Sequence, residues 1–334
     1  MLTTAAIALG LLLGYALQRG GYCMNTAFRS FYLEKDRSLV RAWVLVLIIN
    51  VLGVRLISDL GIVEPNVAPF FWPAAILGGF IFGLGMVMAG GCASGTYYRC
   101  GRGMLGSMAA LIGFVIGTAV IDGGALVGLQ ESARAPVLEF QAGEASLFNV
   151  LGVESPVVRW VVLLALAGAA AVWLWNAPKQ RFLIGWTWRK TGLAVGVLAF
   201  AAWLLSAMQG RQFGLSFTQP TVALTRFLVG GDTSGLSVAS FMVLGVPFGA
   251  LLAAKATGEA VLRMPDPRRF VRQFGGGLTM GVGASVAGGC NIGHSITGVS
   301  TLGLTALLST GFIILGCWVM TGIIYRIESG KEAN

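Results

Sequence analysis

Long apolar stretches separated by short charged ones constrain this sequence more than any other feature. The clearest uncharged runs are residues 160–175, 193–208, 236–254 and 302–325. A helix of about 20 apolar residues spans the roughly 30 Å of hydrocarbon in a bilayer. Because only 11% of the 334 residues are charged, too few remain to cover a soluble surface. We therefore predict an all-α polytopic membrane protein.

The distribution of charge predicts how the chain crosses the membrane. Basic residues gather in 29–41, 178–190 and 255–272, whereas acidic residues predominate in 59–72 and 122–158. Because Lys and Arg concentrate in cytoplasmic loops, the N-terminus is predicted outside and the C-terminus inside the cytoplasm. The same distribution attributes the net charge of +9 to membrane topology and not to nucleic-acid binding. The first apolar run lacks the flanks of a signal peptide and is interpreted as a retained helix.

Two pairs of segments indicate an internal duplication. Residues 82–95 align with 280–293, with seven of 14 positions identical, and residues 18–25 align with 209–216. The charge pattern gives the two units opposite orientations, which predicts an inverted repeat. Such repeats are typical of transporters, with the solute site at the repeat interface. We assign residues 1–121 to the first membrane repeat, 122–190 to an acidic external segment plus a linking transmembrane helix, and 191–334 to the second repeat and a cytoplasmic tail.

Each unit is predicted to contain a broken helix that stops at Gly-Gly-Cys. The helices are expected over 73–89 and 274–287, and the next ones only after the Gly-rich stretches 95–103 and 293–303. Helices this short suggest re-entrant half-helices that meet near the midplane, where irregular backbone must be buried or face a cavity. Their ends and free N–H groups would suit an anion. The alternative is that the glycines only allow close helix packing.

The cysteines at these breaks carry the chemistry. Cys92 and Cys290 occupy equivalent positions and are expected to face each other across a pseudo-two-fold axis. Cys23 lies in another loop of the first unit, where the second unit has Gly214. A neutral thiol is a weak donor and acceptor that can contact a soft sulfur or selenium atom. Cys317 is interpreted as a small buried apolar residue, and no role is assigned to Cys100.

No metal site or cofactor is predicted. His294 is the only histidine, and no Cys-x-x-Cys pair occurs. Either a structural role or a ligand contact fits His294, and copper(I) binding by thiolates stays open as an alternative. Four arginines flank the breaks and could attract an anion or anchor in the lipid headgroups: Arg19, Arg99, Arg102 and Arg211.

Three motifs resemble those of the YeeE/YedE family of bacterial sulphur-transport membrane proteins. They are Q-R-G-G-Y-C-M-N-T-A-F-R at 18–29, F-G-L-G-M-V-M-A-G-G-C-A-S-G-T-Y-Y-R at 82–99 and A-G-G-C-N-I-G-H at 287–294. The resemblance implies an hourglass-shaped protein of the bacterial cytoplasmic (inner) membrane that takes up thiosulfate. It implies that Cys23, Cys92 and Cys290 relay the anion by S–H···S contacts. A small cytoplasmic sulfur-carrier protein of the TusA/YeeD type is an implied partner.

Together these features predict a membrane transporter, not an enzyme, that imports thiosulfate or a closely related inorganic sulfur compound along cysteine thiols. A selenium-compound transporter and a membrane sulfurtransferase using cysteine persulfides are the alternatives. The predicted substrate-binding residues lie at the two breaks and in the first loop: Cys23, Asn25, Gly91, Cys92, Gly289, Cys290, Asn291 and His294.

Overall fold

The regular structure of the chain is helical. The computed structural model describes residues 1–138, 144–153, 155–177 and 185–332, with side chains as far as Arg326, and that part forms no strand. Seven of its helical segments are long and apolar enough to cross a membrane. The prediction of an all-α polytopic membrane protein is confirmed. Residues 178–184, with Lys179 and Arg181 of the predicted basic segment, lie outside the described residues.

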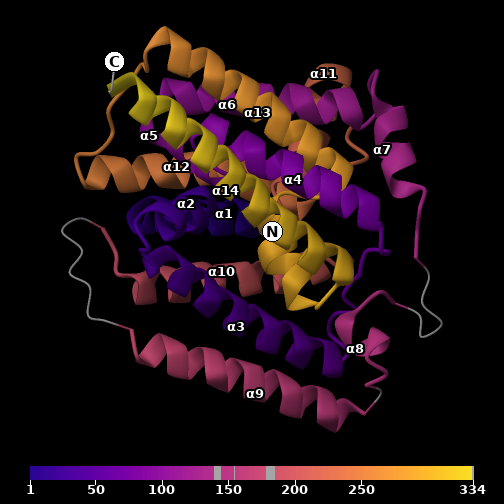
Figure 1. Ribbon diagram of the computed structural model, residues 1–334. Helices are drawn as coiled ribbons and strands as arrows, with labels where there is room; N and C mark the ends of the chain where they lie inside the picture. The colour runs from indigo at the N-terminus through magenta and orange to yellow at the C-terminus, as the bar shows by residue number, and fades with distance from the viewer. Residues whose placement is uncertain (139–143, 154, 178–184, 333–334) are drawn as a thin grey trace.

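The two halves of the chain have the same order of long and short helices (Figure 1). The long helices are α1 (Leu2–Gly20), α3 (Ser38–Asp59), α4 (Trp72–Ala89) and α6 (Leu105–Ile121), then α10 (Trp188–Ala207), α12 (Val238–Ala256), α13 (Pro267–Ala287) and α14 (Leu304–Glu332). A short helix follows the first and third of each set: α2 (Met24–Leu33), α5 (Ala93–Arg102), α11 (Thr218–Gly230) and the π-helix η1 (Gly293–Gly298).

In the described part of the connection between the halves, three helices form: α7 (Val127–Arg134), α8 (Leu147–Val150) and α9 (Pro156–Trp175). The predicted linking helix is α9, which lies at the edge of the molecule beside α3 (Figure 1). Only Leu163 and Leu174 of α9 are buried, so most of its apolar surface is left for lipid. The acidic segment before it folds partly as α7, which packs against α4 and α13.

The packing between the halves is reciprocal. Helix α1 packs against α12, and its counterpart α10 packs against α3. Likewise α6 packs against α13, α14 packs against α4, and α4 and α13 pack against each other. A two-fold relation between duplicated units would produce this pattern, so the packing supports the predicted repeat. Its inversion across the bilayer stays a prediction.

Glycines bring α4 and α13 into backbone contact. A Cβ atom at Gly85 would collide with the backbone of Met280, and one at Gly283 with the backbone of Phe82. Small residues allow helices to approach closely in membranes, where lipid supplies no hydrophobic drive for association. The glycine-rich composition therefore serves helix packing here, in agreement with the alternative reading of these glycines.

Three details of the predicted breaks are wrong. Helix α13 begins at Pro267, not near residue 274, and so has 21 residues, whereas α4 has 18 and starts one residue before its predicted position. The Gly-rich stretches after the breaks are helical, as α5 and η1. The breaks also do not meet: Ala287 lies against Gly78, and Ala89 against Gly276, eleven residues earlier in α13. Eleven residues rise about 16 Å along a helix, so the two breaks lie at opposite ends of the α4–α13 pair.

Candidate functional site

Both helices end in the same way at their breaks. Gly90 follows α4 with φ of 74°, and Gly288 follows α13 with φ of 89°. This left-handed conformation is the usual end of a helix and favours glycine, because it has no Cβ atom. At the first break Cys92 is extended and directly precedes α5. The Gly-Gly-Cys motif thus ends one helix and places a cysteine at the turn that follows.

An arginine donates hydrogen bonds to backbone carbonyl groups at each break. The Arg99 guanidinium donates to the Gly90 carbonyl and to Thr26 Oγ1, at 3.4 Å from the latter. At the second break Arg134 of α7 donates to the carbonyl oxygens of Ser285 at 2.6 Å and Val286 at 3.2 Å. A cation at the negative end of a helix dipole is stabilising. Burial lowers the pKa of Arg134, and Asp122 partly offsets that effect.

This role of Arg134 was not predicted from the sequence. It is the only basic residue of the acidic segment 122–158 before Arg159, and that isolation was the available signal. Arg99, which the sequence marks as an anion-attracting or headgroup-anchoring residue, is instead engaged with the chain itself.

Two of the three predicted thiols are in contact. Cys23 Sγ and Cys92 Sγ lie 3.5 Å apart, and Cys92 Sγ lies 3.4 Å from Ser94 Oγ. Both cysteines are buried in the main apolar core. Gly95 leaves the room for this pair, because a Cβ atom there would lie 2.6 Å from Cys23 Sγ and 3.3 Å from Cys92 Sγ. The arrangement presents two adjacent soft atoms and one hydroxyl group inside the protein.

Cys290 is buried in the same core but is not paired with either of those thiols. The prediction that Cys92 and Cys290 face each other is therefore wrong, and the contact of Cys92 is with Cys23. The reason is the antiparallel packing of α4 and α13, which carries equivalent residues to opposite ends of the pair. The next residue, Asn291, is fully buried, and its side-chain amide has no hydrogen-bond partner in the structure.

The other predicted residues are divided between the two breaks. Gly91 lies beside the Arg99 guanidinium, and Gly289 beside the His294 imidazole. His294 is 6% exposed, and its Nε2 has no partner. Asn25 Oδ1 lies 3.8 Å from the thiol of Cys317, which acts as the donor.

A cavity of about 300 Å³ lies at the second break. Gly289 and His294 line it together with Arg211, Ser216 and Gln212. Arg211 donates to Ser237 Oγ at 3.2 Å and forms no ion pair with a carboxylate of the described residues. Burial lowers its pKa, but a guanidinium keeps its charge in proteins. The cavity thus combines an arginine with hydroxyl and amide groups, and these donors suit an oxyanion.

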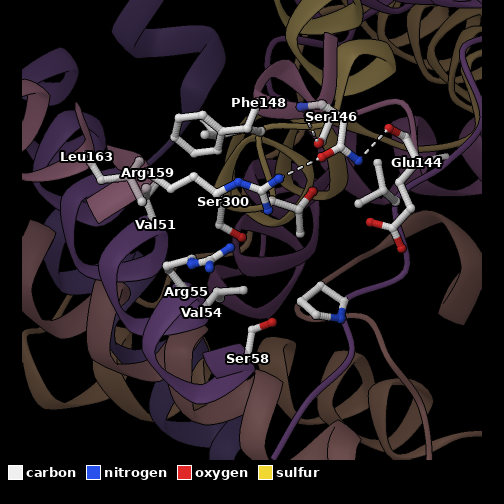
Figure 2. A pocket seen from close by; sticks show the side chains of 15 residues that line it. Val51, Val54, Arg55, Ser58, Glu144, Ser146, Phe148, Arg159, Leu163 and Ser300 are labelled. Carbon is white, nitrogen blue, oxygen red and sulfur yellow. Dashed lines mark hydrogen bonds between the residues drawn. The ribbon is translucent and has the colours of Figure 1, made fainter. Parts of the chain in front are cut away.

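A smaller cavity of about 130 Å³ lies between α3, α8 and α9 (Figure 2). Its two arginines already have partners: Arg55 pairs with Asp59, and Arg159 donates to Asn149 Oδ1 and to the Val153 carbonyl. The first contact lies within α3, and the others join α9 to the segment before it. Both guanidinium groups are thus already engaged, so this cavity is the weaker candidate. Neither cavity is lined by Cys23, Cys92 or Cys290. Among the described residues, no three His, Cys, Asp or Glu side chains gather as a metal site.

Comparison with known proteins places these features in a family. A family model described as sulphur transport matches residues 19–319. A protein of Escherichia coli K12 named thiosulfate transporter TsuA is 33% identical over 326 residues, which cover 95% of this chain and 93% of that protein. The protein of that name from Spirochaeta thermophila is also 33% identical, over an alignment that covers 96% of this chain and 98% of that protein. The probable transporter YedE of Escherichia coli K12 is 30% identical over 118 residues, or 35% of this chain and 28% of that protein.

Proposed function

Since this chain belongs to the sulphur transport family, we propose that it carries thiosulfate into the cytoplasm along its buried cysteines. The family match confirms the resemblance that the sequence motifs predicted, and with it a transport protein and not an enzyme. Two relatives named as thiosulfate transporters align over nearly the whole length of both chains. Their names support thiosulfate as the substrate.

The observation that carries the proposal is the contact between the thiols of Cys23 and Cys92 at 3.5 Å inside the core. Thiosulfate has an oxyanion end and a terminal sulfur atom. Neutral thiols contact soft sulfur weakly, and conduction requires binding weak enough for release. The cavity at the second break would receive the anion from outside, where Arg211 offers hydrogen bonds to its oxygen atoms. Cys290 directly follows Gly289, which lines that cavity, and its thiol would contact the terminal sulfur atom next.

The direction of transport follows from the predicted topology. We place the N-terminus outside and the C-terminus in the cytoplasm of a bacterial cytoplasmic membrane. The cavity then faces outward and the Cys23–Cys92 pair lies nearer the cytoplasm. A small sulfur-carrier protein of the TusA/YeeD type would accept the sulfur there.

Uptake of labelled thiosulfate into proteoliposomes that contain only this protein tests the proposal. The variants Cys23→Ala, Cys92→Ala and Cys290→Ala should each reduce uptake to the level of empty vesicles. Cys100→Ala is the matched control, because this buried cysteine lies two turns beyond Cys92 on α5 and outside the proposed path. Wild-type uptake by the Cys23 and Cys92 variants would refute the role of the thiols. Selenite as a competitor, and intact-mass analysis for persulfides, separate the two alternative functions.

A further inference from the structure

We propose that Tyr97 is the gate between the outer cavity and the inner thiol pair. The inference rests on the proposed function, since it names the residue that would control passage along the proposed path. It explains why the cavity at the second break ends before it reaches Cys92.

Tyr97 joins the two halves of the protein by a hydrogen bond and a ring contact. It lies on α5, five residues after Cys92, and its hydroxyl group is 2.7 Å from Thr221 Oγ1 of α11. The Thr221 hydroxyl donates its one proton to the Phe217 carbonyl, so the Tyr97 hydroxyl is the donor between the two side chains. The rings of Tyr97 and Phe217 are 5.3 Å apart between centroids.

These residues stand where the proposed path would have to continue. Phe217 directly follows Ser216, which lines the cavity, and Phe217 is fully buried. Tyr97 is 6% exposed. The cluster of Tyr97, Phe217 and Thr221 therefore joins the start of α11, where Ser216 and Gln219 line the cavity, to α5, which begins directly after Cys92. An anion that passes this point must displace the two buried rings, because apolar rings cannot replace the water molecules bound to it.

The closure is weak enough to be reversible. One hydrogen bond of ordinary net strength changes an equilibrium about fivefold, so a single bond between side chains holds the gate only loosely. The separation of α5 from α11 at this point would open a route from the cavity to Cys92. In such a gate, loss of the Tyr97 hydroxyl should increase the open population, and loss of the ring should remove the barrier.

Labelling of Cys92 by a charged, membrane-impermeant methanethiosulfonate tests the gate without any transport measurement. The reagent is added on the cavity side of vesicles that hold the full chain, and labelled peptides are mapped by mass spectrometry. In wild type Cys92 should react slowly. Tyr97→Phe should raise the labelling rate about fivefold, the factor for one lost hydrogen bond. Tyr97→Ala should raise it further.

Thr225→Val provides the matched control. Its hydroxyl lies one turn beyond Thr221 on α11 and donates to the Thr221 carbonyl, within its own helix. Labelling in this variant should equal that of wild type. Unchanged labelling of Cys92 in Tyr97→Phe and Tyr97→Ala, both eluting as folded protein from a sizing column, would overturn the gate. Wild-type vesicles without thiosulfate uptake would refute the proposed function, but they would leave the labelling result intact.

Discussion

Replacing Gly85 by alanine should loosen the centre of the protein. A Cβ atom at this position of α4 would collide with the backbone of Met280 in α13 and would lie 2.8 Å from the Gly276 carbonyl oxygen. Backbone atoms of a helix cannot turn aside as a flexible side chain can. The two helices would therefore have to separate, and both breaks depend on these helices for their position.

The expected size of the effect follows from that collision. Insertion of a methyl group into a well-packed interior costs about 1–3 kcal/mol. Alanine returns up to about 1 kcal/mol of helix propensity relative to glycine. Gly275, a helical glycine of the partner helix α13, is the matched control, because no heavy atom lies within 4 Å of a Cβ atom built there. Gly275→Ala gains the propensity without the collision, so the two variants should differ by roughly 2 kcal/mol.

Thermal unfolding in detergent, followed by the loss of the folded peak on a sizing column, measures the difference. With an unfolding entropy of roughly 2.1 cal/mol/K per residue, a change of 1 kcal/mol moves the midpoint of a 334-residue chain by about 1.4 °C. Gly85→Ala should thus unfold about 3 °C below Gly275→Ala. Gly283→Ala should match Gly85→Ala, since its Cβ atom would meet the equivalent backbone at Phe82. Equal unfolding midpoints for the Gly85 and Gly275 variants would refute the close approach of α4 and α13. Unequal midpoints for the Gly85 and Gly283 variants would refute the reciprocal packing of the two helices.

Three further results are expected. Diamide should join Cys23 to Cys92 as a disulfide, because the sulfur atoms lie 3.5 Å apart. Each thiol loses a proton and an electron to this oxidant. Uptake should stop and return with dithiothreitol, and absence of the cross-linked peptide would contradict the contact. Arg134→Met should cost about 1.5–3 kcal/mol, because the carbonyls of Ser285 and Val286 lose a charged donor, although Gln130 still donates to Ser285. An unchanged unfolding midpoint would argue against this. Arg211→Gln should raise the KM for thiosulfate about tenfold with little change in maximal rate; an unchanged KM in the proteoliposome assay would remove Arg211 from the binding site.

Apolar runs predicted the membrane helices well but misplaced the start of α13. The segment from Arg268 to Gln273 is rich in arginine, so hydropathy places the helix start only at Phe274. The helix nevertheless begins at Pro267, where the Asp266 side chain accepts a hydrogen bond from the Arg269 N–H. Hydropathy reports where a helix enters lipid, whereas caps report where it begins. The Asp-Pro pair was the better signal for this boundary.

The contact between Cys23 and Cys92 could not be predicted from the repeat. Sequence alignment showed that Cys92 and Cys290 are equivalent, and equivalence was taken to imply proximity. Residues related by a two-fold axis meet only where the axis passes between them. In the antiparallel pair of α4 and α13 this happens near the middle of the helices, and the breaks lie at the ends. The sequence thus indicated which cysteines lie at equivalent breaks, but not which cysteines are neighbours in the folded protein.

The difference between the duplicated loops, and not their similarity, gives the proposed path a direction. Gly214 takes the place of Cys23 in the second unit, and a Cβ atom there would lie 2.5 Å from Nε1 of the buried Trp203. A second thiol pair, opposite Cys290, therefore cannot form without displacing Trp203. The second break offers the Arg211 guanidinium instead. An anion arriving through the cavity would first exchange water for hydrogen bonds to its oxygen atoms and only then meet two adjacent thiols. In this order, the costly desolvation of the charge is compensated before the weak sulfur contacts begin.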